Sequence, residues 1–234
     1  MSDKKVSAVI LAAGTGTRMG ASKPKQYLEI GGISVLRRCV MAFFECDIID
    51  SIVVVVPEND KLLVENELAD LISKPLTVVE GASTRAGSAR LGVKATPENT
   101  DFVAIHDGAR CLVTPAMIRA VVDEARLYGA ATAGYYSTDT VKQTKCGIIT
   151  KTIERSGVFL ASTPQVFEKS VYTAAVEKSQ CGEDNTDDNM IMEKYGVSVH
   201  CVDVGKNNIK ITLPEDILYA EFLISERKKE SDAG

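Results

Sequence analysis

The chain has 234 residues, of which 45% are hydrophobic and 25% charged, and its formal net charge is −5. This balance fits a globular protein and argues against a nucleic-acid-binding surface, which normally carries a basic excess. Six scattered cysteines and two histidines, without a C-x-x-C pair, make a zinc site or a disulfide framework unexpected in a chain of this length.

Five short runs rich in β-branched residues predict buried strands, because they are apolar on both alternating faces. In chain order they are Val6–Leu11, Ile52–Val56, Leu76–Val79, Phe102–Ile105 and Val197–Val202. The first run is too short to cross a membrane and does not have the layout of a signal peptide. We therefore expect a cytoplasmic protein with no membrane partner.

Stretches with helical spacing separate these runs. They are expected to begin near Leu36, near Ser83, after Thr114-Pro115 and at Pro214, and the last should end near Arg227 before a frayed tail. Strands that alternate with helices predict an α/β, Rossmann-like fold with a mainly parallel sheet and helices on both faces. We expect residues 1–234 to form a single domain.

The alternation loosens over residues 137–160. Two extended segments, Thr138–Lys142 and Ile148–Ile153, flank the turn Lys145-Cys146-Gly147 and predict a β-hairpin rather than a strand–helix unit. We expect this hairpin to project from the domain as an arm. The arm is either a lid or a dimer contact. If it is a dimer contact, we expect the protein to be a homodimer.

A glycine-rich segment follows the first predicted strand: Ala12-Ala13-Gly14-Thr15-Gly16-Thr17-Arg18-Met19-Gly20. In an open parallel sheet this position lies at the carboxyl edge, where ligands bind. The spacing G-x-G-x-x-x-G differs by one residue from the dinucleotide-binding fingerprint, and the G-K-[ST] ending of a P-loop is absent. By itself the segment is either an anion-binding loop or a plain tight turn.

Basic residues in and after the loop favour an anion. Arg18 lies within the loop, and Lys25 follows it beside Pro24. Because positive charges around a bent glycine loop repel one another unless an anion is bound, we expect a triphosphate as the ligand. The alternative for Lys25 is an ordinary solvated surface lysine.

Further motifs follow the glycine loop in order: Pro24-Lys-Gln-Tyr27, His106-Asp-Gly-Ala-Arg110, Asp139-Thr-Val-Lys142, Thr163-Pro-Gln165, Thr186-Asp-Asp188 and Asn208-Ile-Lys-Ile-Thr212. The set resembles the nucleotidyltransferases of sugar-nucleotide type. More narrowly, it is similar to the 2-C-methyl-D-erythritol 4-phosphate cytidylyltransferase family of the non-mevalonate isoprenoid pathway. The resemblance spans Val6 to about Phe222.

The resemblance implies transfer of a cytidylyl group from CTP to 2-C-methyl-D-erythritol 4-phosphate, with release of pyrophosphate. A substrate phosphate oxygen attacks the α-phosphorus of CTP, so the protein mainly aligns groups and stabilises charge. The family pattern assigns this stabilisation to Arg18 and Lys25. It implies nucleotide contacts, including a segment around the cytosine, from Ala12, Ala13, Gly14, Gly16, Ala82, Ser83, Arg85, Ser88 and Gly108.

Asp107 follows the predicted strand Phe102–Ile105 and so also lies at the carboxyl edge. A carboxylate there suits Mg²⁺, which prefers oxygen ligands and bridges phosphates; the alternative is a turn cap. We expect His106 to be structural and Ser83 to serve also as a helix N-cap. Cys111 stands where the family often has proline, and the neighbouring arginine suggests the hypothesis of a lowered thiol pKa.

For the sugar phosphate, the resemblance implies contacts from Lys210, Arg110, Thr140 and Arg155. Lys210 lies between two isoleucines, which predicts a short strand with the lysine on the opposite face. Thr140 and Arg155 lie on the predicted arm and, by resemblance, reach the site of the partner subunit. The active site would then be shared across a dimer interface.

Three alternatives remain at this stage. A ribitol 5-phosphate cytidylyltransferase would share the fold and the chemistry, but the motifs at His106 and at Asn185 fit the methylerythritol family better. The glycine spacing and Pro57, which stands where an acidic residue would follow a strand, argue against an NAD-dependent oxidoreductase. A non-catalytic nucleotide-binding regulator would bind CTP without releasing pyrophosphate.

Overall fold

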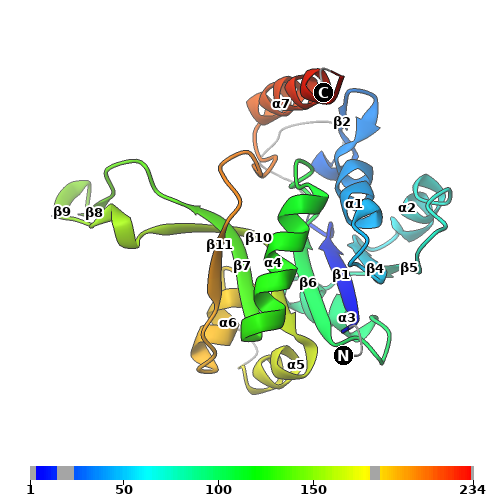
Figure 1. The fold of residues 1–234 in the computed structure, drawn as a ribbon, viewed down its shortest axis with the longest axis horizontal. Coiled ribbons are helices and arrows are strands. Elements are labelled where there is room, and N and C mark those ends of the chain that lie inside the picture. Colours follow the sequence, from blue (N-terminus) through cyan, green and yellow to red (C-terminus); the bar gives the residue numbers. More distant parts are fainter. Residues whose placement is uncertain (1–3, 15–23, 180–184, 233–234) are drawn as a thin grey trace.

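The computed structural model describes residues 4–14, 24–179 and 185–232 of the chain. Its centre is a sheet in the order β11-β7-β10-β6-β1-β4-β5 (Figure 1). The strands of this sheet are β1 (Val6–Leu11), β4 (Ser51–Val56), β5 (Leu76–Glu80), β6 (Phe102–Asp107), β7 (Ala130–Tyr136), β10 (Phe159–Glu168) and β11 (His200–Asp203). Neighbouring strands pair in parallel, except that β10 is antiparallel to both β6 and β7.

Helices surround this sheet on both faces, which confirms the predicted α/β, Rossmann-like architecture (Figure 1). They are α1 (Val35–Glu45), α2 (Lys61–Glu67), α3 (Arg85–Lys94), α4 (Pro115–Tyr128), α5 (Lys169–Lys178), α6 (Asp188–Lys194) and α7 (Pro214–Asp232). Short elements complete the described part of the chain: η2 (Lys25–Tyr27), β2 (Glu29–Ile30), β3 (Ile33–Ser34) and η3 (Arg155–Gly157).

Alternating side chains of the central strands build two apolar layers. On β1, Ala8 and Ile10 pack with residues of α1, α4 and α7 on one face. Val9 packs on the other face with residues of α3, α5 and α6. Because both faces of the sheet are buried, the sequences of the central strands are continuous apolar runs. β1, β4 and β6 therefore lie at the centre of the fold.

Local signals position α4. Thr114 caps the helix by accepting a hydrogen bond from the Met117 N–H at 3.3 Å, and Pro115 occupies the first turn, as predicted. Gly129 ends the helix with a φ of 89°, a left-handed conformation that glycine adopts at little cost. The helix therefore stops one residue before β7 begins.

The arm is present as a two-stranded antiparallel sheet of β8 (Lys142–Lys145) and β9 (Ile148–Thr152), and it projects away from the central sheet (Figure 1). Cys146 and Gly147 form its turn with φ values of 51° and 77°. The predicted hairpin is confirmed, but its first strand begins at Lys142 rather than at Thr138.

Several sequence-based expectations are wrong in detail. Strand β11 begins only at His200, and α7 continues to Asp232 instead of ending near Arg227. Thr84, not Ser83, caps α3 by accepting a hydrogen bond from the Gly87 N–H at 3.0 Å. Lys210 lies in a loop and not on a strand, because the segment pairs with no neighbouring strand of the described chain.

Candidate active site

Three loops meet at the carboxyl edge of the parallel strands, after β1, β5 and β6. They enclose a cavity of about 390 Å³ together with η2 and the loop that precedes α7. Its described lining consists of Leu11, Ala12, Ala13, Gly14, Lys25, Gln26, Ala82, Ser83, Thr84, Arg85, Ser88, Asp107, Ala109, Lys210 and Thr212. The cavity lies where an open α/β sheet binds its ligands.

The β1 and β5 loops lie against each other because Gly81 has no side chain. A Cβ atom at Gly81 would lie 2.5 Å from the Ala13 Cβ and 2.8 Å from the Ser88 Oγ. Ser88 then fixes the next residue: its Oγ accepts from the Ala82 N–H at 3.0 Å and donates to the Ala82 carbonyl at 3.2 Å. The backbone of the β5 loop is thus preorganised at the cavity.

Asp107, the last residue of β6, is the centre of charge in the site. Its Oδ2 accepts from the Lys210 Nζ at 2.8 Å and lies 3.6 Å from the Arg110 Nε, and its Oδ1 lies 3.4 Å from the Arg85 Nε. Burial acts to raise the pKa of this carboxyl, but Lys210 and Arg85 outweigh burial and hold the pKa well below its ordinary value. Asp107 is therefore ionised at neutral pH.

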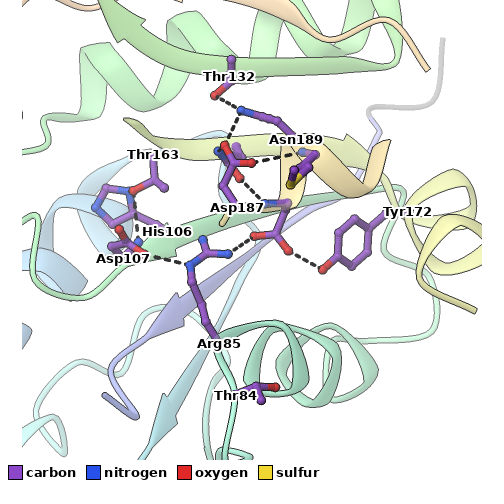
Figure 2. Close-up of polar contacts among 12 residues, drawn as sticks. Thr84, Arg85, His106, Asp107, Thr132, Thr163, Tyr172, Asp187 and Asn189 are labelled. Carbon is purple, nitrogen blue, oxygen red and sulfur yellow. Dashed lines mark hydrogen bonds and ion pairs between the residues drawn. The ribbon is translucent and has the colours of Figure 1, made fainter. Parts of the chain in front are cut away.

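Arg85 joins this cluster to a second buried carboxylate (Figure 2). Its Nη1 donates to Asp188 Oδ2 at 2.6 Å, and the hydroxyl of Tyr172 donates to Asp188 Oδ1 at 2.7 Å. Burial acts to lower the pKa of Arg85, but Asp188 and Asp107 outweigh it and raise the pKa. Tyr172 keeps its proton, because burial and the adjacent Asp188 raise its pKa well above the ordinary value.

His106 is buried beneath the site and does not line the cavity. Thr163 Oγ1 accepts from the Asp107 N–H at 3.1 Å and lies 3.0 Å from His106 Nδ1. Because His106 Nε2 faces the Arg110 carbonyl, which can only accept, Nε2 carries the proton of the neutral ring and Nδ1 accepts from the Thr163 hydroxyl. The His106 Nε2 then donates to the Arg110 carbonyl at 3.2 Å. Burial lowers the pKa of His106 to about 4, and the neutral imidazole has the structural role predicted for it.

The loop that carries Lys210 is tied to the same region. The Asn208 side chain donates through Nδ2 to the Thr163 backbone carbonyl at 2.7 Å, and the Asn208 backbone carbonyl accepts from the Arg110 Nη1 at 2.9 Å. The Ile211 N–H donates to the Ala109 carbonyl at 2.8 Å, and the Ile211 side chain is buried. These contacts turn Lys210 towards Asp107.

The structure brings together most of the residues that the sequence singled out. Ala12, Ala13, Gly14, Lys25, Ala82, Ser83, Arg85, Ser88, Asp107 and Lys210 all line the cavity. Gly108 lies under the β1 loop, where its N–H donates to the Leu11 carbonyl at 2.8 Å, and Arg110 reaches the site through Asp107. Gly16 and Arg18 lie outside the described residues.

Two predicted residues lie away from this cavity, on or beside the arm. Thr140 is exposed, and Arg155 donates from Nη1 to the Thr138 carbonyl at 2.9 Å. The hypothesis of a reactive Cys111 is wrong: the side chain is buried, and burial raises its pKa to about 11. The thiol is therefore protonated at neutral pH.

Sequence reasoning did not assign a role to several residues of the site. Gln26, Thr84, Ala109 and Thr212 line the cavity, Asp188 binds Arg85 from behind it, and Tyr172 in turn binds Asp188. Asp188 belongs to the quoted Thr186-Asp-Asp188 motif, which was the only available signal. No sequence signal pointed to Tyr172, because nothing in the spacing of α5 distinguishes it from an ordinary core aromatic residue.

Comparison with known proteins assigns the chain to a family. The family profile described as 2-C-methyl-D-erythritol 4-phosphate cytidylyltransferase matches residues 6–226. The chain belongs to this family. A cytidylyltransferase of this name from Caldanaerobacter subterraneus is 40% identical over 223 residues, which are 94% of this chain and 98% of that protein. The one from Syntrophus aciditrophicus is 36% identical over 228 residues, covering 96% and 97% of the two chains.

Solved structures agree with this cytidylyltransferase assignment. The crystal structure of 4-diphosphocytidyl-2C-methyl-D-erythritol synthase from Anaerococcus prevotii superposes with a TM-score of 0.84 at 29% identity. The match covers 96% of this chain and 100% of the other. Within the described residues, no helix combines the length and the apolar character needed to cross a bilayer.

Proposed function

We propose that this member of the cytidylyltransferase family transfers a cytidylyl group from CTP to 2-C-methyl-D-erythritol 4-phosphate. The products are 4-diphosphocytidyl-2-C-methyl-D-erythritol and pyrophosphate, in the synthesis of isoprenoid precursors. The observation that carries the proposal is the cavity at the carboxyl edge, whose lining includes Lys25, Arg85, Lys210 and Asp107 in a chain of this family. The cytoplasm is the proposed compartment.

The chemistry needs positive charge more than it needs a base. The attacking group is a phosphate oxygen, which is already nucleophilic, and negative charge accumulates on the α-phosphate and the leaving pyrophosphate. In the described lining, cationic side chains outnumber carboxylates, so the cavity is suited to a triphosphate. We assign charge stabilisation to Lys25 and to Arg18, and nucleotide binding to the β1 and β5 loops.

We propose Mg²⁺ as the cofactor, held by Asp107. The described residues contain no group of three His, Cys, Asp or Glu side chains that could hold a metal ion by themselves. That fits magnesium, which commonly takes one or two carboxylates and completes its shell with water and substrate phosphates. The ionised, cavity-facing Asp107 provides such a carboxylate, and when bound the ion would neutralise charge on the triphosphate.

We further propose that the active protein is a homodimer in which the arm reaches the partner's cavity. The basis is the position of Thr140 and Arg155, which do not line the cavity of their own chain. Lys210 and Arg110 would bind the sugar phosphate from the cavity side, and Thr140 and Arg155 from the partner's arm.

A pyrophosphate-release assay tests the proposed function. Purified protein with CTP and Mg²⁺ is expected to release pyrophosphate when 2-C-methyl-D-erythritol 4-phosphate is added. Ribitol 5-phosphate, offered in parallel, is expected to give no turnover. Turnover only with ribitol 5-phosphate would reassign the substrate, and CTP binding without turnover on either alcohol phosphate would favour a regulatory protein.

A further inference from the structure

The guanidinium of Arg85 is shared unequally between two carboxylates. Its Nη1 lies 2.6 Å from Asp188 Oδ2, whereas its Nε lies 3.4 Å from Asp107 Oδ1 (Figure 2). Charge-assisted bonds between arginine and carboxylate are normally about 2.7–2.9 Å long, so only the bond to Asp188 is fully formed. Arg85 is therefore anchored at Asp188 and only approaches Asp107.

Asp188 is held firmly enough to act as that anchor. Its side chain is 1% exposed, and it accepts from the Tyr172 hydroxyl at 2.7 Å through the oxygen that does not bind Arg85. Its backbone N–H donates to the Gln165 Oε1 at 3.1 Å. Tyr172 in turn stacks on Phe167, with ring centroids 5.5 Å apart. Tyr172 of α5 thus holds the carboxylate of Asp188, and Gln165 of β10 holds its backbone.

The two oxygens of Asp107 consequently differ. Oδ2 has the close contact to the Lys210 Nζ at 2.8 Å and the Arg110 Nε nearby, whereas among the described residues the cation facing Oδ1 is Arg85, at the longer distance of 3.4 Å. If Asp188 carried no charge, Arg85 would gain by closing on Oδ1, because opposite charges in a buried site attract strongly. The strong anchor therefore keeps one oxygen of Asp107 accessible.

We infer that Asp188 is a positioning residue, which acts through Arg85 to leave Asp107 Oδ1 available to a divalent cation. This inference rests on the proposed function, which places Mg²⁺ at Asp107. Tyr172 supports the same role by holding the Asp188 carboxylate in place. Asp188 contacts neither the cavity nor the reacting groups, so it is not a catalytic residue.

The test is the Mg²⁺ requirement for CTP binding, measured by calorimetry in a series of Mg²⁺ concentrations without the second substrate. Asp188→Asn keeps the shape of the side chain and removes its charge. We expect the Mg²⁺ concentration for half-maximal CTP affinity to rise about tenfold, the usual lower range for losing a residue that orients a metal ligand. In a protein that already carries Arg85→Ala, the additional Asp188→Asn substitution should not raise the Mg²⁺ requirement further.

Asp187→Asn is the matched control. Asp187 is the adjacent carboxylate, and within the described part of the chain its Oδ2 accepts from Gln165 Nε2 at 2.9 Å and from Asn189 Nδ2 at 3.0 Å rather than from Arg85. It should leave the Mg²⁺ requirement unchanged, although it also removes the charge of a half-buried, hydrogen-bonded carboxylate. A comparable shift in this control would overturn the inference, because the effect would then be one of packing or overall charge.

Two further outcomes would overturn it: an unchanged Mg²⁺ requirement in Asp188→Asn, or an equal shift in the Arg85→Ala background. If Asp188→Asn does not fold, Tyr172→Phe removes one bond to Asp188 and retains the charge. It is expected to raise the requirement about twofold to threefold, in line with the loss of one hydrogen bond, and no rise would count against the inference. Pyrophosphate release by the wild-type protein tests the proposed function separately.

Discussion

The cavity edge and the arm are opposite in construction. At the edge, Asp107 and Asp188 are buried carboxylates whose cationic partners come from distant segments of the same chain. On the arm, every residue of β8 and β9 is exposed, including Ile148 at 70% and Ile149 at 61%. A two-stranded hairpin is marginally stable by itself. The charge network at the edge is therefore formed within one chain, whereas the exposed arm agrees with the proposed contact to a partner chain.

The largest expected effect is at the cavity edge. Lys25→Met should lower kcat about a thousandfold, because it removes a charge that stabilises the developing negative charge in a water-poor site. Thermal unfolding should change little, since Lys25 is not part of the core. Steady-state pyrophosphate release and a melting curve measure both. A variant that keeps more than a tenth of the wild-type kcat would remove Lys25 from the proposed mechanism.

The burial of His106 beneath the cavity edge also predicts that protein stability depends on pH, an effect not expected from the exposed residues of the arm. Burial lowers the folded-state pKa of His106 to about 4, below the ordinary histidine value of about 6.5. As the pH falls from about 6.5 to 4, the unfolded chain binds a proton that the folded chain does not, and stability should drop by about 3 kcal/mol. His106→Gln should lack this part of the drop in urea unfolding at pH 7 and pH 4. Parallel losses in both proteins would contradict the assignment.

Sequence patterns were sufficient for the parallel half of this molecule. β1, β4 and β6 were predicted because they are apolar on both faces; the bounds of β1 are confirmed, whereas β4 begins one residue earlier, at Ser51, and β6 continues through the polar residues to Asp107. Strand β10 was not predicted because Pro164 lies within it and its pairing with β7 shifts register between Ala161 and Gln165. Its antiparallel direction depends on long-range pairing, which leaves no local periodic signal.

The residues of the site likewise fall into those that sequence patterns could predict and those that they could not. Loops that follow apolar strands could be placed at the carboxyl edge, so Asp107 was found from the sequence. The strand expected around Lys210 was wrong because the isoleucine alternation there packs one side chain, Ile211, into the core without a neighbouring strand. Asp188 and Tyr172 come from α6 and α5, and only the folded structure shows that Asp188 binds Arg85 and that Tyr172 binds Asp188.

The exposed arm leads to the next prediction. The double substitution Ile148→Asp with Ile149→Asp should convert a dimer into monomers, because charged groups cannot be buried at an apolar contact without a partner. Activity should fall about a hundredfold, as both Thr140 and Arg155 would lose the partner's cavity. Sedimentation velocity and the pyrophosphate assay measure the two effects. A fully active monomer would refute the proposed role of the arm.

A smaller effect is expected from the arm's charge alone. Arg155→Ala should raise the KM for the sugar phosphate about tenfold, which corresponds to the loss of one charge-assisted hydrogen bond, and should leave the KM for CTP unchanged. Arg119→Ala, which removes an exposed arginine far from the arm in sequence, is the matched control. An unchanged KM for the sugar phosphate would separate Arg155 from substrate binding.

The most direct test of a site shared between one chain's cavity and its partner's arm is complementation. Lys25→Met and Arg155→Ala chains are mixed under conditions in which subunits exchange, and pyrophosphate release at a sugar-phosphate concentration well below the wild-type KM is compared with each variant alone. A mixed dimer has one site built from an intact cavity and an intact arm, so activity should recover to about a quarter of the wild-type value. If the arm served only its own chain, mixing would restore nothing beyond the average of the two variants, and the shared site would be contradicted.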